Sequence, residues 1–536
     1  MKRAALTALA TAQFVMVLDQ SVMNVSISQL VEDFDTTVPT IQAVITLYCL
    51  VMAMLMLTGG KIGDIIGRRR AFRIGLVIYA IGSATTALAP TVWVLALGWS
   101  ILEGIGAALV LPALAALIAG NFEGAARKSA YAVIGGVAGA GIAIGPILGG
   151  WATTELTWRV VFVGEVVLVA MILALTPKIA DALRDGPEPR LDVVGAFLSA
   201  AGIGAMVLGV LQSSTWGFIT PKDSPVEPLG FSLAVFVVIG GAVLLWAFVE
   251  WSRRREAHGL DPLVHLRLFS VLPLRSGLIG LFTQNLVLMG VFFVVPLYLQ
   301  LVIGLDALET GIRMLPISIT MFVCSALGSK LSAKVSVRAL VRSGLIISTV
   351  AIVVLIATVD PQLRDAGFAV SMALLGVGMG LIVSQLGNVV QSSVDASGRG
   401  EAGGLQYTGQ QLGSSVGVAL IGAIVFAGLT NVFVQVVESD QRIAPEVAHQ
   451  VGVAAGDGVD FVASEQLAAA AVDAGIDDAS AAAIVDDYEH AQLRALKNGL
   501  LATGVLALLS LMSTRNLPAS VGNEDDEELA ARSAPS

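Results

Sequence analysis

Two long apolar runs, Ile41–Thr58 and Ile74–Ala89, flank a short charged stretch, Gly59–Arg73, and this pattern restricts the fold more than any other feature. A helix needs about 20 apolar residues, or about 17 at the short end, to cross a hydrocarbon core. Each run therefore predicts a membrane-spanning helix. The charged stretch contains five Lys or Arg residues and one Asp. Because basic residues gather on the cytoplasmic side, this loop sets the predicted orientation of the first three spans.

The composition extends this prediction to the whole chain. Hydrophobic residues make up 56% and charged residues only 13% of the sequence, whereas soluble domains carry roughly 25% charged residues. Only helices or closed barrels span lipid, and the continuous apolar runs favour helices. We therefore predict an all-α polytopic membrane protein whose first run, Ala4–Leu30, is an uncleaved span. Fourteen spans are expected, centred near residues 18, 50, 80, 107, 141, 168, 203, 239, 286, 321, 349, 378, 420 and 503. Both termini then lie in the cytoplasm, together with most of the 31 Lys and Arg residues.

The charged stretch also carries a motif. Its residues are Gly60, Asp64, Gly67, Arg68 and Arg69. Their spacing resembles the loop between helices 2 and 3 of the major facilitator superfamily, and the chain as a whole resembles its 14-span drug:proton antiporters. The resemblance implies two six-helix bundles plus two extra spans, with this motif as a cytoplasmic gate. A generic loop of basic residues is the alternative.

The expected division of the chain follows from this resemblance and from polar, Pro-containing linkers. We predict an N-terminal bundle at 1–177, a linker with two extra spans at 178–272, a C-terminal bundle at 273–515 and an acidic cytoplasmic tail at 516–536. The segment Val436–Ala491 contains twelve acidic residues and one Arg and should lie outside the cell. It is expected to form a small helical hairpin or a mobile flap, with Ser464 and Asp478 as possible N-caps.

Three acidic residues fall inside predicted spans: Asp19, Glu103 and Glu165. A charge inside the membrane is costly, so each is a candidate for proton coupling or for binding substrate charge. All three are predicted at middle to outer depth, where one cavity could expose them. Asp19 lies in a segment that resembles the first-helix motif of 14-span antiporters. It could instead be a structural clasp, hydrogen-bonded to neighbouring helices.

The other two acids depart from the family pattern. Ser100 and Glu103 stand where the fourth helix of relatives normally has Arg and Gln, so Glu103 either takes the proton itself or is a neutral buried residue. Glu165 stands where an Asn is usual in the sixth helix, and it could instead pair with Arg159. Two such changes favour a cationic substrate or more than one proton per cycle.

A glycine-rich segment lies in the predicted fifth span. It consists of Gly141, Gly145, Pro146, Gly149 and Gly150, and it resembles the antiporter motif of exporters in this superfamily. Proline bends a helix and glycines permit close helix packing. A generic packing face is the alternative.

Further polar and aromatic residues are weaker candidates for the cavity wall. They are Asn24, Ser100, Gln284, Asn285, Phe292, Gln385, Gln406, Tyr407 and Gln410. We find no catalytic constellation, metal-ligand spacing or phosphate-binding loop, so no enzyme activity, cofactor or metal is expected. The expected partners are membrane lipid, protons and a small amphipathic substrate, without nucleic acid, and the protein should be monomeric.

The sequence thus predicts a proton-coupled exporter of amphipathic, cationic or polyspecific compounds across the plasma membrane. Three alternatives stay open: export of an endogenous lipid or metabolite, uptake or uniport, and a non-transporting sensor or scaffold. The antiporter motif argues against uptake, and only the long outer segment Val436–Ala491 supports a scaffold.

Overall fold

The fold is known from a computed structural model that describes residues 2–122, 124–181, 190–221, 224–332, 334–394, 399–456, 459, 461–474 and 476–518. Within these ranges the chain forms helices and no strand. Thirteen helical stretches of the described chain are long and apolar enough to cross a membrane. The all-α polytopic fold class is therefore confirmed.

The helices follow the predicted order along the chain. The first part contains α1 Lys2–Val25, α2 Ile27–Asp33, α3 Val38–Ile66, α4 Arg68–Ala87, α5 Val92–Leu95, η1 Ala96–Glu103, α6 Gly104–Asn121, α7 Gly124–Trp151, η2 Ala152–Leu156 and α8 Arg159–Leu175. The second part contains α9 Val193–Trp216, α10 Leu233–Ala257, η5 Leu266–Ser270, α11 Leu272–Leu297, η6 Tyr298–Val302, α12 Ala307–Leu331, α13 Val337–Thr358, α14 Asp365–Ser392, α15 Arg399–Ser439, α16 Pro445–Gly456, α17 Ser464–Asp473, α18 Asp478–Ser510 and η7 Leu511–Asn516. Every predicted span centre lies in one of these helices. The third predicted span is α4, which is not among the thirteen apolar stretches because its first turns carry four arginines.

Two seams join the helices before residue 176 to those after residue 271. In the first part, α1 packs against α7, and α4 packs against α3, η1, α6 and α8. In the second part, α12 packs against α14, and α11 packs against α15 and α18. The parts meet where α7 packs on α12 and where α3 packs on α15. The first part therefore has an interior of its own, formed by α1, α3, α4, η1, α6 and α8.

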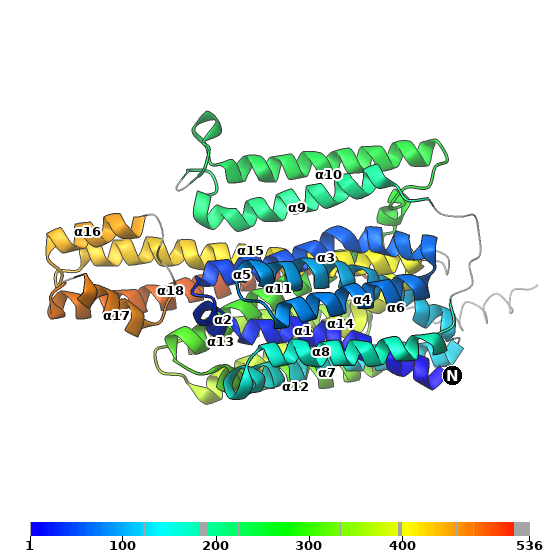
Figure 1. The fold of residues 1–536 in the computed structure, drawn as a ribbon, viewed down its shortest axis with the longest axis horizontal. Helices are drawn as coiled ribbons and strands as arrows, with labels where there is room; N and C mark the ends of the chain where they lie inside the picture. The colour runs from blue at the N-terminus through cyan, green and yellow to red at the C-terminus, as the bar shows by residue number, and fades with distance from the viewer. Residues whose placement is uncertain are drawn as a thin grey trace, which may run out of the picture.

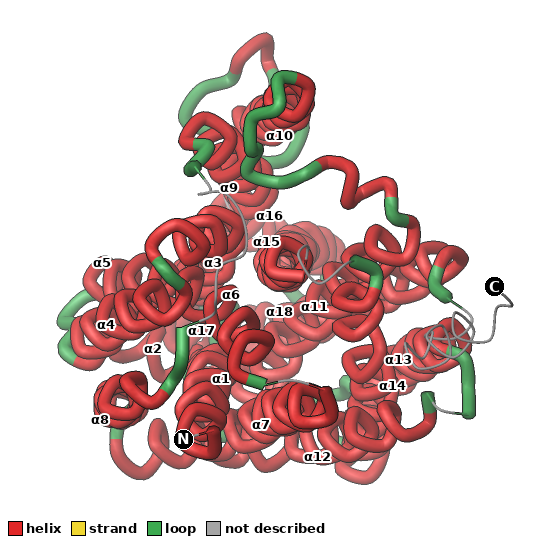
Figure 2. Tube along the Cα trace, turned by 90° about the vertical axis from the view of Figure 1, so that its right-hand side faces the viewer, coloured by secondary structure: helices red, strands yellow, loops and turns green. Residues whose placement is uncertain are grey.

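The pair α9 and α10 lies along one side of this body (Figure 1). The end-on view places α9 between α10 and the rest (Figure 2). α10 packs mainly on α9, and α9 packs on α3 and α15. A small apolar cluster of Leu50, Ala53, Ile203 and Val207 forms this contact. The two extra spans are thus attached through α9.

At the end of the long axis away from the N-terminus, α16, α17 and the ends of α15 and α18 project beyond the bundle (Figure 1). The predicted outer segment is therefore a helical hairpin in its described parts. It has a core in which Phe433 and Tyr488 meet edge to face at 5.6 Å and the Tyr488 hydroxyl accepts a hydrogen bond from the Val462 amide. The N-caps are wrong by one residue: α17 is capped by Ala463 rather than Ser464, and α18 by Asp477 rather than Asp478. A hydrogen bond from the backbone amide of Ser480 lowers the pKa of Asp477 below its usual value. The predicted acidic run of the tail lies outside the described residues.

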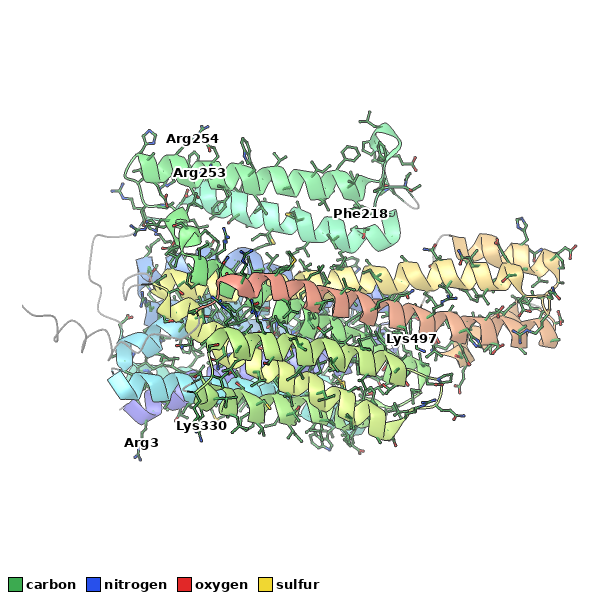
Figure 3. The ribbon with its side chains drawn as sticks, turned by 180° about the vertical axis from the view of Figure 1, so that it is seen from behind. Arg3, Phe218, Arg253, Arg254, Lys330 and Lys497 are labelled. Atoms are coloured by element: carbon green, nitrogen blue, oxygen red, sulfur yellow. The ribbon has the colours of Figure 1, made fainter. Side chains whose placement is uncertain are left out.

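Basic residues gather at the other end of the bundle. Arg3 and Lys330 lie at this end on one side of the molecule, and Arg253 and Arg254 lie at the same end on the other side, whereas Phe218 and Lys497 lie farther toward the projecting hairpin (Figure 3). We call these the basic end and the hairpin end. The positive-inside rule assigns the basic end to the cytoplasm.

Candidate functional site

The three predicted intramembrane acids come together in the first part of the chain. Asp19 lies on α1, Glu103 ends η1 and Glu165 lies on α8. At most 1% of each residue is exposed, and one carboxylate oxygen from each lies within 4.8 Å of the other two. We call this group the acid triad. The sequence placed the three residues at similar depth, but only the packing of four helices brings them into contact.

Hydrogen-bond donors from other helices surround the acid triad. Trp99 Nε1 donates to Asp19 at 2.7 Å. Glu103 accepts a hydrogen bond from the Thr86 hydroxyl at 3.2 Å. Glu165 accepts from the hydroxyls of Tyr79 and Ser83, both at 3.2 Å. Each carboxylate therefore has one oxygen that is held by a donor.

The second oxygen of each carboxylate is buried and has no hydrogen-bond partner in the described part of the chain. No described Lys or Arg forms an ion pair with Asp19, Glu103 or Glu165. An ionised carboxylate is strongly disfavoured in such surroundings unless a counter-charge is present. Three carboxyl groups this close together are suited to hold protons or a cation, and carboxylate oxygens are also ligands of hard metal ions.

The sequence analysis missed the donors of this site. Tyr79, Ser83 and Thr86 follow one another at intervals of four and three residues on α4, so they share one face of the helix. Trp99 precedes Glu103 by four residues in η1, a π-helix. π-Helical turns are rare and often mark functional sites. The polar face of α4 could have been recognised from the residue spacing in the sequence, whereas the π-helix could not.

Close helix contact positions Glu103 against α4. A Cβ added to Gly82 would lie 2.6 Å from Glu103 Cγ and 2.8 Å from the Glu103 amide nitrogen. A Cβ added to Gly98 would lie 2.6 Å from the Thr86 hydroxyl oxygen. Two glycines therefore permit the approach of η1 to α4 that brings Glu103 to its donor.

Arg159 does not pair with Glu165, which was the alternative that the sequence left open. Its guanidinium bonds to the Asp33 carboxylate at 3.1 Å and to the Ala89 carbonyl at 3.1 Å. It also lies over the Trp158 ring, 4.3 Å from the centroid. Arg159 therefore does not neutralise Glu165, which is buried in the interior of the first part.

The glycine-rich motif of α7 packs against the helix that carries Asp19. Gly141, Gly145 and Gly149 repeat every four residues and face α1. Their nearest neighbours on α1 are Val17, Ser21 and Val22, respectively. Val17 and Ser21 each lie two residues from Asp19, which corresponds to about 200° of rotation, so these two contacts lie on the side of α1 away from the acid triad.

The last residues of the same motif face the second part of the chain. A Cβ on Gly150 would overlap the backbone of Ala307, and a Cβ on Gly311 would overlap the Pro146 carbonyl. The motif therefore lies in the seam between α7 and α12. One short segment contacts both the acid-bearing helix and the opposite part of the protein.

The predicted gate motif forms the turn between α3 and α4. Gly67 has a φ of +96°, a conformation that favours glycine. Arg68 Nε forms an ion pair with a carboxylate oxygen of Asp64 at 3.1 Å, and the two residues are four positions apart in the sequence. A Cβ added to Gly60 would lie 3.6 Å from Pro112 Cβ of α6, which is an ordinary van der Waals contact.

The other basic residues of this turn reach more distant segments. Arg69 bonds to the Ile179 carbonyl, and its amide bonds to the Asp181 carboxylate, both at 3.1 Å. Lys61 forms an ion pair with Asp261, in the segment before α11. The gate region is therefore tied to the chain that links the two parts.

The weaker cavity candidates are spread over α1, η1, α11, α14 and α15. Four of the nine donate to backbone carbonyls: Ser100 to Val44, Asn24 to Gln20, Asn285 to Leu281, and Gln385 to Gly328. Gln406 accepts a hydrogen bond from Gln391, whereas Gln284 and Phe292 are buried and Tyr407 and Gln410 are half-buried. Gln20, which adjoins Asp19, bonds to Gln411 on α15 at 3.0 Å.

Comparison with known proteins agrees with this architecture. The Major Facilitator Superfamily model matches residues 9–191 and 190–418. The multidrug efflux pump LfrA of Mycolicibacterium smegmatis is 27% identical over 511 residues, which cover 95% of this chain and 94% of that protein. The tetracenomycin C resistance and export protein of Streptomyces glaucescens is 27% identical over 436 residues, which cover 80% and 77% of the two chains.

Solved structures share the fold. The crystal structure of a bacterial homologue of the human lysosomal transporter Spinster matches with a TM-score of 0.59 and 17% identity, covering 96% of this chain and 97% of that one. The family model covers most of the sequence, and the described helices have the same arrangement. This chain therefore belongs to the major facilitator superfamily and is a multi-pass transporter of the plasma membrane rather than an enzyme.

Proposed function

We propose that this transporter exports amphipathic cations from the cytoplasm in exchange for protons, and that the acid triad binds these protons. The observation that carries the proposal is the contact of three buried carboxyl groups without a basic partner among the described residues. Two unit charges 4.8 Å apart repel by about 3.5 kcal/mol at an effective dielectric constant of about 20. A triad with three negative charges is therefore strongly disfavoured, and the closed site retains protons.

Antiport requires that the triad exchange these protons for substrate charge. When water or a cation reaches the site, the carboxyl groups can release protons and neutralise the substrate instead. Protonation and substrate binding then favour different arrangements of the two parts of the protein, which is the condition for coupling. The triad contains three titratable groups, which supports more than one proton per cycle.

The relatives support the direction of transport. They include a multidrug efflux pump and a resistance and export protein. The α7 motif packs on α1, which carries Asp19, and on α12. A movement of one part of the protein relative to the other would therefore change the packing around α1. Export of an endogenous metabolite is the second candidate, because another relative is described as a probable actinorhodin transporter of Streptomyces coelicolor.

The test uses the full-length protein in liposomes with an imposed pH gradient and an internal pH dye. Tetraphenylphosphonium and ethidium are the probes, and the variants are Asp19→Asn, Glu103→Gln and Glu165→Gln. Glu250→Gln is the matched control, because Glu250 pairs with Arg254 on the surface of α10. We expect substrate-dependent proton movement in wild type and in the control, and its loss in at least one triad variant.

Two results would contradict the proposal. Unchanged coupled flux in all three triad variants would exclude the triad as the proton site. Folded protein that moves no protons with either cation would favour a metabolite exporter with a narrow substrate range.

A further inference from the structure

A groove of about 450 Å³ lies between α11 and the end of α18 with η7, outside the acid triad. Its walls are apolar along most of their length, and they include Ile279, Phe282, Leu286, Leu506 and Leu509. Ile279 is 44% and Leu509 is 54% exposed. Exposed apolar residues on membrane-spanning helices face lipid, so the groove opens toward the bilayer.

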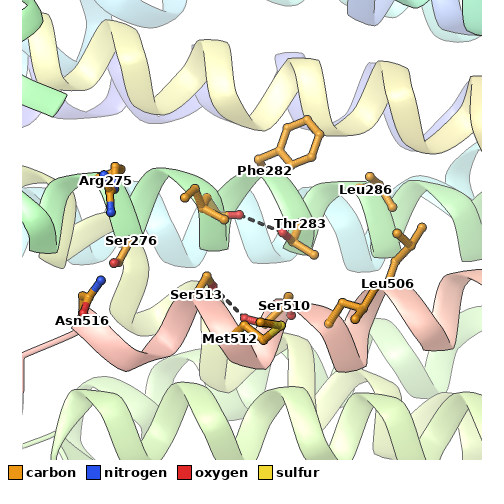
Figure 4. A pocket seen from close by; sticks show the side chains of 12 residues that line it. Arg275, Ser276, Phe282, Thr283, Leu286, Leu506, Ser510, Met512, Ser513 and Asn516 are labelled. Carbon is orange, nitrogen blue, oxygen red and sulfur yellow. Dashed lines mark hydrogen bonds between the residues drawn. The ribbon is translucent and has the colours of Figure 1, made fainter.

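One end of the groove is polar. Arg275, Ser276 and Asn516 lie together at this end, while Phe282, Leu286 and Leu506 lie farther along it (Figure 4). No hydrogen bond or ion pair joins the side chains of Arg275, Ser276 or Asn516 to another residue in the described ranges. The polar end therefore offers a guanidinium and further donors that the protein itself does not use.

The polar end lies at the basic end of the bundle. Arg275 stands in the first turn of α11, after the linker from Arg253 and Arg254, and Asn516 ends η7. Arg338 and Arg342 of α13 bond to Leu517 and Thr514 and so hold η7 in place. The opening thus lies at the level of the headgroups of one leaflet.

The length of the groove fits one lipid chain. Arg275 and Leu286 are eleven residues apart on one helix, which corresponds to about 16 Å at ~1.5 Å per residue. Half of a hydrocarbon core is about 15 Å thick. A phosphate bound at Arg275 would therefore place an acyl chain along the apolar wall down to the bilayer midplane.

The charges decide between occupants. A cationic substrate is repelled by Arg275, and a choline headgroup adds a positive charge beside the guanidinium. An anionic phosphate instead forms a charge-assisted hydrogen bond with it. The Ser513 hydroxyl, which lies nearer the polar end, donates to the Ser510 carbonyl, so its oxygen still accepts a hydrogen bond from a headgroup.

We propose that the groove between α11 and α18 is a binding site for an anionic glycerophospholipid of the cytoplasmic leaflet, with its phosphate at Arg275 and an acyl chain along Phe282 and Leu286. A phosphatidylglycerol-type headgroup fits best, since it carries one negative charge and hydroxyl donors. The lipid would join α11 to the last span without entering the acid triad.

Native mass spectrometry of the full-length protein in detergent tests this site. The probes are phosphatidylglycerol and phosphatidylcholine with identical palmitoyl and oleoyl chains. We expect Arg275→Gln to weaken phosphatidylglycerol binding about tenfold, equivalent to ~1.4 kcal/mol, and to leave phosphatidylcholine binding unchanged. Arg253→Gln is the matched control, because Arg253 is an exposed Arg at the same end that does not line the groove.

A second variant tests the apolar wall. Ile279→Trp fills the groove and keeps Arg275, so it should also weaken phosphatidylglycerol binding. Equal losses in Arg275→Gln and Arg253→Gln would mean diffuse attraction to a basic surface and would overturn the proposal. Unchanged binding in Ile279→Trp, or displacement of the lipid by glycerol 3-phosphate at similar concentrations, would exclude a site that holds an acyl chain.

Discussion

The contact between α4 and η1 allows a sharp test of how the acid triad is built. Gly82→Ala adds a Cβ that would lie 2.6 Å from Glu103 Cγ and 2.8 Å from the Glu103 amide nitrogen, whereas ordinary contacts begin at 3.4 Å. The helices must therefore separate by roughly 0.8 Å, the difference between 3.4 and 2.6 Å. Because part of the clash is with backbone, a side-chain rotation cannot relieve it.

The consequence for the site follows from the same geometry. Thr86 lies one turn after Gly82 on α4 and donates to Glu103 at 3.2 Å. A separation of about 0.8 Å would lengthen this contact beyond the 3.5 Å at which hydrogen bonds become negligible. Overpacking of this kind costs about 1–3 kcal/mol. Gly82→Ala should thus lower both the thermal stability and the proton coupling of the transporter.

The matched control is Gly164→Ala. Gly164 precedes Glu165 on α8, and an added Cβ there meets no atom within 4 Å. Both substitutions gain the same helix propensity, about 1 kcal/mol, so the difference between them isolates the clash. The assays are the thermal midpoint of the protein in detergent and coupled flux in liposomes. If Gly82→Ala equals the control in both assays, the close packing of α4 and η1 does not position Glu103.

Three further predictions follow from the donors, the outer surface and the hairpin. Tyr79→Phe or Ser83→Ala removes one hydrogen bond of ~1 kcal/mol from Glu165, so coupled flux should fall about fivefold, and a flux equal to wild type in both would refute a role for these donors. Partial burial alone would raise the pKa of Asp33, but hydrogen bonds from Gln29, Trp158 and Arg159 hold it below the usual 3.8. The ionised form therefore stabilises the fold above about pH 4 and this stability is lost on acidification, so Asp33→Asn should lower the thermal midpoint at pH 7 more than at pH 3; equal losses at both pH values would contradict this. Because the hairpin has its own core, replacing Val436–Ala491 by a short linker should leave at least partial flux in liposomes, whereas complete loss in folded protein would favour a scaffold.

Much of the fold could be predicted from the sequence because the bilayer limits the alternatives. A long apolar run must form a helix in lipid, since its backbone polar groups have no other partners. The predicted span centres therefore lie in helices. The outer segment was harder to predict, because Ala-rich polar sequence allows both a flap and the continuation of helices; in the structure α15 continues to Ser439 and α18 begins at Asp478.

The site was only partly readable. The cost of an intramembrane charge singled out Asp19, Glu103 and Glu165. The same reasoning could not tell whether Glu165 would meet Arg159, which precedes it on α8, or the acids of α1 and η1. Arg159 binds Asp33 instead, through contacts between segments more than a hundred residues apart. The partners of the polar candidates in the second part could not be predicted, because Gln385 bonds to Gly328 of α12 and Gln406 to Gln391 of α14, contacts that depend on how the helices pack.

The sequence by itself determined the spans, their basic end and the identity of the acids that the membrane makes costly. Only the tertiary structure decided that these acids lie within 4.8 Å of one another, which donors hold them, and that no described basic residue neutralises them. The physical reason is that depth in the membrane follows from position along each helix, whereas contact depends on how helices rotate and pack. That packing depends on residues such as Gly82 and Gly98, whose effect appears only when two helices meet.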